Sequence, residues 1–401
     1  MAVQAGRLFA VCLASIGLIS PLAIHLFLPV IPVLKQSFAV TDAQAQMSFS
    51  LALLVMAIST LVYGSLSDRY GRRPVLLSGL ALFLLGGLIG VLADSMTMLI
   101  VGRLVQAIGA GCGTTLVRTI ARDAYGPDKL VQVISYLTMF YTVGPMFAPM
   151  IGGFLIDAFD WRAVFMFSLG AGFVVSLGAY FFVPETRPGA KPPPGQGILR
   201  GYADLFAHPR FTGYSFQPCF STGVFFADAT AASFIMKEYL HRPSSEFGLY
   251  FFLFPAGFLC GSFVSSRIGN RVATETMVLA GSIILCLAVL VQASLLLSGH
   301  VSPQTIFFPA FFIPFAQGIS LPYAQSGAMA TIPRLAGTAS GVSIFAQSFG
   351  GAVFAQLYGM LADGTLWPMA LVTGSSAVLC VMFGALPYAL RLRENAARRN
   401  F

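Results

Sequence analysis

The sequence predicts an all-α integral membrane protein with twelve transmembrane helices in two pseudo-symmetric six-helix bundles. Only 9% of the 401 residues are charged and 57% are hydrophobic, whereas soluble domains carry about 25% charged residues. Apolar runs of the roughly 20 residues that cross a bilayer recur along the whole chain. One long polar break divides these runs into two groups of six, and this division predicts the two bundles.

Each apolar run is expected to be a helix, because loops and open strands leave backbone groups unpaired in lipid. The first run is too long for the core of a signal peptide and is expected to remain as a helix. Pro309, Pro314 and Pro322 interrupt the tenth run. The expected spans are 8–32, 45–66, 74–94, 97–120, 131–157, 161–183, 211–236, 246–266, 275–297, 304–327, 338–362 and 367–390.

The polar break carries four prolines between positions 188 and 194, which favour an extended chain over a helix. It predicts an N-terminal six-helix bundle over 1–183, a cytoplasmic linker over 184–210 and a C-terminal six-helix bundle over 211–401. Lys and Arg are distributed unequally between alternate loops, with eighteen on one side and four on the other. Because basic loops remain in the cytoplasm, both termini are expected there, in a multi-pass protein of the cell inner membrane.

Several classes of protein are excluded by the same pattern. The formal charge of +8 could suggest nucleic-acid binding, but the basic residues lie in short loops between apolar runs. The six cysteines lie inside apolar runs and lack metal-ligand spacing. No nucleophile motif or phosphate-binding loop is present. We therefore expect no enzyme activity, no cofactor, no metal site and no nucleic-acid partner.

The loop after the second span has a specific spacing of glycine, acidic and basic residues. Its sequence, Gly64-Ser-Leu-Ser-Asp68-Arg69-Tyr-Gly71-Arg72-Arg73, matches the signature G-x-L-x-D-R-x-G-R-R of the major facilitator superfamily. The chain resembles this superfamily, which implies the major facilitator fold. A degenerate copy begins at Gly261, 197 residues after Gly64, as expected of two related halves. The resemblance implies a cytoplasmic gate formed by Gly64, Asp68, Arg69, Gly71, Arg72 and Arg73.

The fifth span resembles the antiporter motif G-x-x-x-G-P-x-x-G-G of this superfamily, with alanine in place of one glycine. Proline and glycine let such a helix bend and pack closely on a neighbour. The alternative is the ordinary enrichment of Gly and Pro in membrane helices. In the superfamily this motif marks exporters, so the resemblance implies export. The matching residues are Gly144, Ala148, Pro149, Gly152 and Gly153.

Shorter segments point to one branch of the superfamily. Those at 27–32, 117–123, 161–162 and 184–187 resemble the Bcr/CflA drug:proton antiporters. That branch usually carries an acidic residue in its first helix, a few positions before a Leu-Pro pair. The corresponding position here is occupied by His25, so the usual proton-carrying carboxylate is replaced.

Three ionisable residues lie within spans, where such residues are costly and usually functional. His25 and Asp228 each lie 17 residues from the start of their span, and Arg103 lies at a similar depth. We hypothesise that all three form a proton-coupling site. Alternatively, His25 hydrogen-bonds a neighbouring helix, Arg103 bonds helix carbonyls, and Asp228 lies in a polar vestibule. Asp157, at the outer end of the fifth span, is expected at the membrane interface.

These inferences predict a secondary active transporter that exports lipophilic drugs or small toxic compounds in exchange for protons, by alternating access. Export of an endogenous metabolite or siderophore is an alternative, and a non-transporting receptor is a distant one. The expected partners are the lipid bilayer, a small-molecule substrate and protons, and the chain is expected to be a monomer. Residues suggested as lining the substrate cavity are Tyr136, Tyr141, Phe225, Phe226, Gln317 and Gln325.

Overall fold

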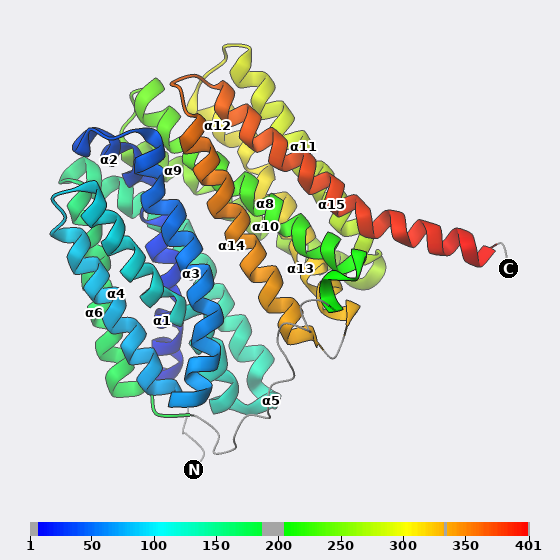
Figure 1. Cartoon of the computed structure of the whole chain (residues 1–401), viewed down its shortest axis with the longest axis horizontal. Coiled ribbons are helices and arrows are strands. Elements are labelled where there is room, and N and C mark those ends of the chain that lie inside the picture. Colours follow the sequence, from blue (N-terminus) through cyan, green and yellow to red (C-terminus); the bar gives the residue numbers. More distant parts are fainter. Residues whose placement is uncertain (1–6, 187–203, 333–334, 400–401) are drawn as a thin grey trace. The chain divides into compact units, whose positions relative to one another are not determined.

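The computed structural model describes residues 7–186, 204–332 and 335–399, and every regular element among them is a helix (Figure 1). The chain divides into two compact units. Unit 1 consists of Met1–Pro193 and Arg242–Leu249, and unit 2 consists of Pro194–His241 and Tyr250–Phe401. Most of the predicted linker lies at 187–203, outside the described residues, so its conformation stays a prediction.

Unit 1 contains the helices of the first half of the chain together with most of one short helix from the second half. The loops between them are short, and polar side chains cap several helix starts: Thr41 accepts from the backbone of Gln44, and Ser95 accepts from Met98. The elements are α1 (Arg7–His25), η1 (Leu28–Val30), α2 (Ile31–Phe38), α3 (Asp42–Tyr70), α4 (Arg72–Val91), α5 (Met96–Ala158), α6 (Trp161–Phe182) and α9 (Ser244–Phe251).

The helix α5 differs from the prediction, because the expected break between the fourth and fifth spans is helical throughout. It is not a straight rod. Gly113 packs against the Ile16 carbonyl, and Gly144 packs against Pro21 of the same helix α1. A straight helix would separate these glycines by about 46 Å at 1.5 Å per residue, whereas Ile16 and Pro21 are only about 8 Å apart along α1. The chain therefore reverses direction between Gly113 and Gly144. The part of α5 before this reversal is called the first limb, and the part after it is called the return limb.

Unit 2 is built around α8, which is the most deeply buried of the long apolar helices and packs against α14 and α15. The predicted tenth span is broken after Ala310 into α12 and α13, as its prolines indicated. The elements are α8 (Pro209–Phe234), η2 (Ile235–Tyr239), α10 (Leu253–Ile268), η3 (Gly269–Arg271), α11 (Thr274–Leu297), α12 (Pro303–Ala310), α13 (Phe312–Thr331), α14 (Ala336–Leu361) and α15 (Trp367–Arg399).

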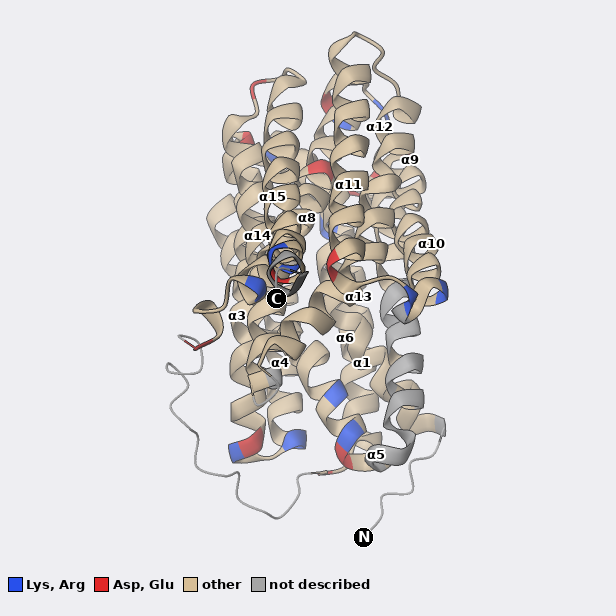
Figure 2. Cartoon of the chain, turned by 90° about the vertical axis from the view of Figure 1, so that its right-hand side faces the viewer, with Lys and Arg blue, Asp and Glu red and all other residues tan. Residues whose placement is uncertain are grey.

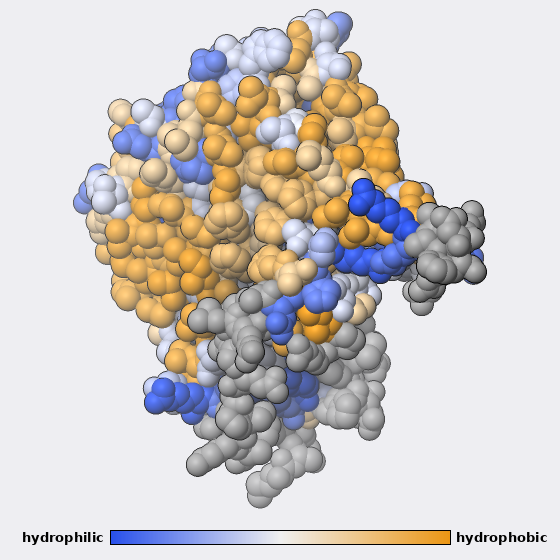
Figure 3. All heavy atoms as spheres, turned by 45° about the vertical axis from the view of Figure 1, so that its right-hand side comes forward, coloured by the Kyte–Doolittle hydropathy of each residue, from blue (hydrophilic) through white to orange (hydrophobic). Residues whose placement is uncertain are grey.

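The outer faces of the helices are apolar, as a lipid-facing surface requires. Large side chains such as Val174, Phe181 and Leu371 are more than half exposed, and hydrophobic residues cover broad areas of the described surface (Figure 3). Charged residues gather toward helix ends (Figure 2). Eleven segments of the described chain are long and apolar enough to cross a membrane, and the return limb of α5 is the twelfth. The predicted all-α, twelve-span membrane fold is confirmed.

Candidate functional site

The predicted gate motif occupies the junction of α3 and α4 in unit 1. A single residue, Gly71, joins the two helices with φ of +103°, a conformation that glycine adopts far more readily than other residues. A Cβ atom there would also lie 2.6 Å from the Glu185 carboxylate. Gly64 is less constrained, since a Cβ atom would meet Thr115 at an ordinary 4.0 Å.

Arg72 is the centre of this cluster, and its side chain is almost completely buried. Its Nη1 atom lies 2.6 Å from Asp68 Oδ1 and donates to Ser67 Oγ at 2.7 Å. Its Nε atom donates to Asp123 Oδ2 at 3.0 Å, and the Asp123 side chain is only 4% exposed. Removing one partner of a buried ion pair leaves an uncompensated charge and is strongly destabilising. These contacts therefore fix the start of α4.

Glu185 completes the cluster from the segment after α6. Its two carboxylate oxygens accept hydrogen bonds from the backbone N–H groups of Arg72 (2.8 Å) and Arg73 (3.1 Å). The first turn of α4 has no acidic residue of its own, and a carboxylate there satisfies unpaired N–H groups and favours the helix dipole. Arg73 also donates from Nη2 to the Tyr180 carbonyl at 2.8 Å, which ties α4 to α6.

Sequence reasoning did not assign Glu185 or Asp123 to the gate, although both lie in the segments that carry the branch resemblance. Glu185 is 113 residues from its partner Arg72 in sequence, and Asp123 is 51 residues from it. The missing acid in the first turn of α4 was the available signal for a capping carboxylate from elsewhere. Arg69 has a different role from Arg72, since its guanidinium lies over the Tyr70 ring at 5.3 Å.

Arg103 is buried on the first limb of α5. Its Nη1 donates to Gln106 Oε1 at 2.7 Å and its Nε to the Ser48 carbonyl at 3.4 Å. Its guanidinium lies 4.1 Å from the centre of the Phe27 ring. His25, two residues before Phe27, is the buried last residue of α1. His25 on α1 and Arg103 on α5 therefore belong to two helices that pack against each other.

Asp228 lies on α8 of unit 2, six residues before the end of the helix, with an exposed fraction of 0%. Neither of its carboxyl oxygens has a hydrogen-bond partner among the described residues. The Gln292 side chain on α11 lies beside this carboxyl group. One of its two amide N–H groups donates to the Ile306 carbonyl at 2.9 Å, which leaves the second available to Asp228. The relation of Asp228 to His25 and Arg103 stays a prediction.

The glycines of the predicted antiporter motif face two different neighbours within unit 1. Gly144 faces α1, and Gly152 faces the segment just after it, where a Cβ on Gly152 would clash with the Leu26 carbonyl. Gly153 faces the other way, and a Cβ there would clash with the Ser244 carbonyl. Ala148, in place of the usual glycine, is buried. The motif thus allows backbone-to-backbone packing on two faces of one helix limb.

The residues suggested for the substrate cavity lie apart from the described pockets. Phe225 and Phe226 are in edge contact at 4.9 Å, within an aromatic cluster that includes Phe254. Gln317 donates to Ser221 Oγ at 3.4 Å, and Gln325 is half-buried. The side chains of Tyr136 and Tyr141 lie outside the described residues. The cavity role of these six residues stays a prediction.

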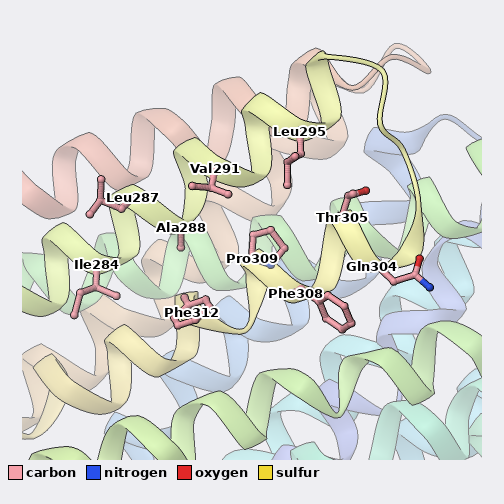
Figure 4. Close-up of a pocket in the computed structure, with 10 residues that line it drawn as sticks. All are labelled: Ile284, Leu287, Ala288, Val291, Leu295, Gln304, Thr305, Phe308, Pro309 and Phe312. Carbon is pink, nitrogen blue, oxygen red and sulfur yellow. The ribbon is translucent and has the colours of Figure 1, made fainter.

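The described pocket in unit 2 is an apolar groove of about 500 Å³ on the outer faces of three helices (Figure 4). Its wall consists of side chains of α11 and α12 together with Phe312 at the start of α13, where Pro309 precedes the helix break. Leu287, Val291 and Phe308 in this wall are each more than half exposed. The groove is therefore open to the bilayer side of unit 2.

Comparisons with known proteins agree with this fold. A family model of the Major Facilitator Superfamily matches residues 13–355. The chain is 32% identical over 394 residues to multidrug resistance protein D of Escherichia coli K12, covering 96% of each chain. It is 27% identical over 403 residues to the bicyclomycin resistance protein homolog of Haemophilus influenzae, covering 98% of each.

Two solved structures share the fold at low sequence identity. A bacterial homolog of the human lysosomal transporter Spinster has a TM-score of 0.77 at 17% identity and 95% coverage of each chain. A D-xylose–proton symporter has a TM-score of 0.75 at 14% identity, with 94% of this chain and 97% of that chain covered. The matched family, the relatives that align over nearly their whole length and the predicted gate motif at the α3–α4 junction agree, and the chain belongs to the major facilitator superfamily.

Proposed function

We propose that this protein exports lipophilic drugs or small toxic compounds across the cell inner membrane in exchange for protons, by alternating access. The observation that carries the proton coupling is Asp228, whose carboxyl group is fully buried in a membrane-spanning helix without a hydrogen-bond partner among the described residues. Full-length relatives named for resistance to drugs and to bicyclomycin support the class of substrate.

A carboxylate without a partner is costly to bury in an apolar environment. Asp228 is therefore suited to bind a proton, or a cationic substrate, in one state of the transport cycle and to release it in another. Gln292 is the neighbouring polar side chain that could stabilise either form. Competition between proton and substrate for one carboxyl group is a direct way to couple their opposite movements.

His25 and Arg103 extend this proposal to unit 1. Histidine is the side chain that changes charge most easily near neutral pH. The guanidinium of Arg103 is held by Gln106 and by the face of the Phe27 ring, so a fixed positive charge lies close to the end of α1. We propose that these residues tune proton binding, while the Asp68–Arg72–Asp123 cluster stabilises one conformation of the cytoplasmic gate.

The proposal includes a topology and an assembly state. Both termini are assigned to the cytoplasm, and the protein acts as a monomer with the bilayer, protons and the transported compound as its partners. In this proposal the protein requires no cofactor and has no enzymatic activity.

The test is transport into inside-out vesicles under an imposed pH gradient, with a panel of lipophilic cations and neutral drugs. Wild type should accumulate at least one compound, and Asp228→Asn should abolish the response to the gradient. His25→Ala should change the dependence of transport on pH. Asp363→Asn is the control, because Asp363 is an exposed acid that accepts hydrogen bonds from Thr365 in a loop.

Three results would redirect the proposal. A wild type no faster than empty vesicles for the whole panel would contradict the drug assignment and favour a narrow metabolite exporter. Gradient-driven transport that survives in both Asp228→Asn and His25→Ala would show that protons take another path. No proton-driven movement of any small molecule would leave the receptor alternative.

A further inference from the structure

The segment Arg242–Leu249 belongs to unit 1, although the residues on both sides of it belong to unit 2. The first change of unit coincides with irregular backbone. Before the segment lie the π-helix η2 (Ile235–Tyr239) and His241, a non-glycine residue with φ of +52°. After it, α9 and α10 are separate elements on either side of Phe252, although Phe252 itself keeps helical φ and ψ. Positive φ and π-helical turns are costly and concentrate at functional sites.

Asp157, at the end of the return limb of α5, holds the start of this segment. Its Oδ1 accepts from the backbone N–H of Ser244 at 3.0 Å, and its Oδ2 accepts from that of Ser245 at 2.7 Å. The carboxylate thereby caps α9 from a helix 87 residues earlier in the chain. Hydrogen bonds to an ionised acceptor are roughly twice as strong as neutral ones, and the helix dipole strengthens them further.

The rest of the contact is a seam of backbone against backbone. A Cβ on Gly153 would clash with the Ser244 carbonyl, and a Cβ on Gly248 would lie 2.5 Å from both the Pro149 carbonyl oxygen and Met150 Cα. Glycine on both sides lets the two helices touch without interlocking side chains. Because the contact is made by backbone atoms, the two helices can separate without disengaging interlocked side chains.

We propose that Asp157 is a positioning residue of the transport cycle, which docks α9 on the outer end of α5 and must release it once in each cycle. This inference rests on the proposed function for the existence of a cycle and for the outer location of this helix end. Asp157 itself is exposed to solvent, so its carboxylate can be hydrated when α9 leaves. The irregular backbone at His241 supplies a point where the segment can turn.

A neighbouring residue provides a matched control. Asp160, three residues later, caps α6 by accepting from the backbone N–H groups of Arg162 (2.8 Å) and Ala163 (3.2 Å). The chemistry is the same, but Asp160 and its partners are adjacent in sequence. This cap therefore stays formed whether or not α9 is docked.

The first experiment measures how often α9 is released. Ser244 is only 5% exposed, so Ser244→Cys, in a chain whose six native cysteines are replaced, reports undocking through reaction with a membrane-impermeant maleimide. Adding Asp157→Asn should accelerate labelling about tenfold, because the charge of the cap is lost. Adding Asp160→Asn should leave the rate unchanged. Equal rates in all three chains would overturn the proposal.

The second experiment prevents release. In the same cysteine-free chain, Asp157→Cys with Ser245→Cys should form a disulfide on mild oxidation, stop ethidium transport, and regain activity after reduction. Asp160→Cys with Ala163→Cys is the control pair and should not affect transport when oxidised. Undiminished transport with the first pair fully cross-linked would show that transport does not require release of α9 and would overturn the proposal.

The two experiments separate this inference from the proposed function. Labelling of Ser244→Cys is measured without a transported compound, so it decides whether α9 is released even if ethidium is not a substrate. The cross-linked pair decides whether that release is required for transport. Loss of fold is checked by the melting temperature and by the labelling of an exposed residue, His300→Cys, in each background. A change in melting temperature without a change in Ser244→Cys labelling would make Asp157 a purely structural cap and contradict the proposal.

Discussion

Arg103 illustrates at the level of one residue how a membrane protein buries a cation without an acid. Among the described residues its partners are a backbone carbonyl, the Gln106 amide and the face of the Phe27 ring. Gln106 in turn donates to Ser168 at 3.3 Å, so the arginine is the start of a polar chain across α5 and α6. Because the planar guanidinium uses its fork of donors and its flat face together, lysine cannot replace it.

We predict that Arg103→Lys lowers the melting temperature in detergent while leaving the dependence of transport on pH unchanged. Lysine keeps the positive charge but cannot reach the carbonyl, the amide and the ring at the same time. Thermal unfolding and vesicle transport between pH 6 and pH 8 are the measurements. A variant with normal stability and a displaced pH profile would instead assign Arg103 to proton coupling.

Glu185 and Glu394 permit a comparison between a capping carboxylate and a surface ion pair. Glu185→Gln should destabilise the protein by about 1 kcal/mol, because the charge at the start of α4 is lost and one oxygen becomes a donor that faces another donor. Glu394→Gln breaks a 2.7 Å contact with Arg210 in which the glutamate is 56% exposed, and should change stability by less than about 0.5 kcal/mol. Chemical unfolding of both variants checks the order.

At the level of the element, the return limb of α5 shows why glycine position matters more than glycine content. Gly152 lies against the Leu26 carbonyl, whereas nothing lies within 4 Å of the Cβ that could be added at Gly170 on α6. In an open position, alanine improves helix propensity by about 1 kcal/mol. In a tight position the helices must separate, and lost packing outweighs that gain.

Gly152→Ala should therefore lower the melting temperature and Gly170→Ala should leave it unchanged or raise it. The expected cost at Gly152 is about 1–3 kcal/mol, the range for overpacked positions. Melting in detergent and the yield of monodisperse protein are the measurements. A Gly152→Ala variant as stable as wild type would mean that α5 and the segment containing Leu26 shift apart at little cost.

At the level of the whole molecule, the unequal distribution of Lys and Arg between alternate loops predicts which ends of the helices face the cytoplasm. The helix α11 offers a direct test, because Arg271 and His300 flank its opposite ends and both are exposed. In intact cells, His300→Cys should react with a membrane-impermeant maleimide. Arg271→Cys should react only after the membrane is permeabilised. The reverse pattern would invert the assigned topology of every span.

The sequence by itself determined the class of fold, the twelve spans, the gate motif and the small-residue motif of the fifth span. These features depend on composition, on the length of apolar runs and on local spacing, which the bilayer constrains strongly. The position of Asp228 within α8 also followed from its place in an apolar run.

Only the tertiary structure decided which distant residues complete these features. Glu185 caps α4 across 113 residues, and Asp157 caps α9 across 87, because each unit brings helix ends together that no local pattern connects. The continuity of α5 and the assignment of Arg242–Leu249 to unit 1 were likewise outside the reach of the sequence. A helix start with unpaired N–H groups is satisfied by whichever carboxylate the packing delivers, and packing is a property of the folded chain.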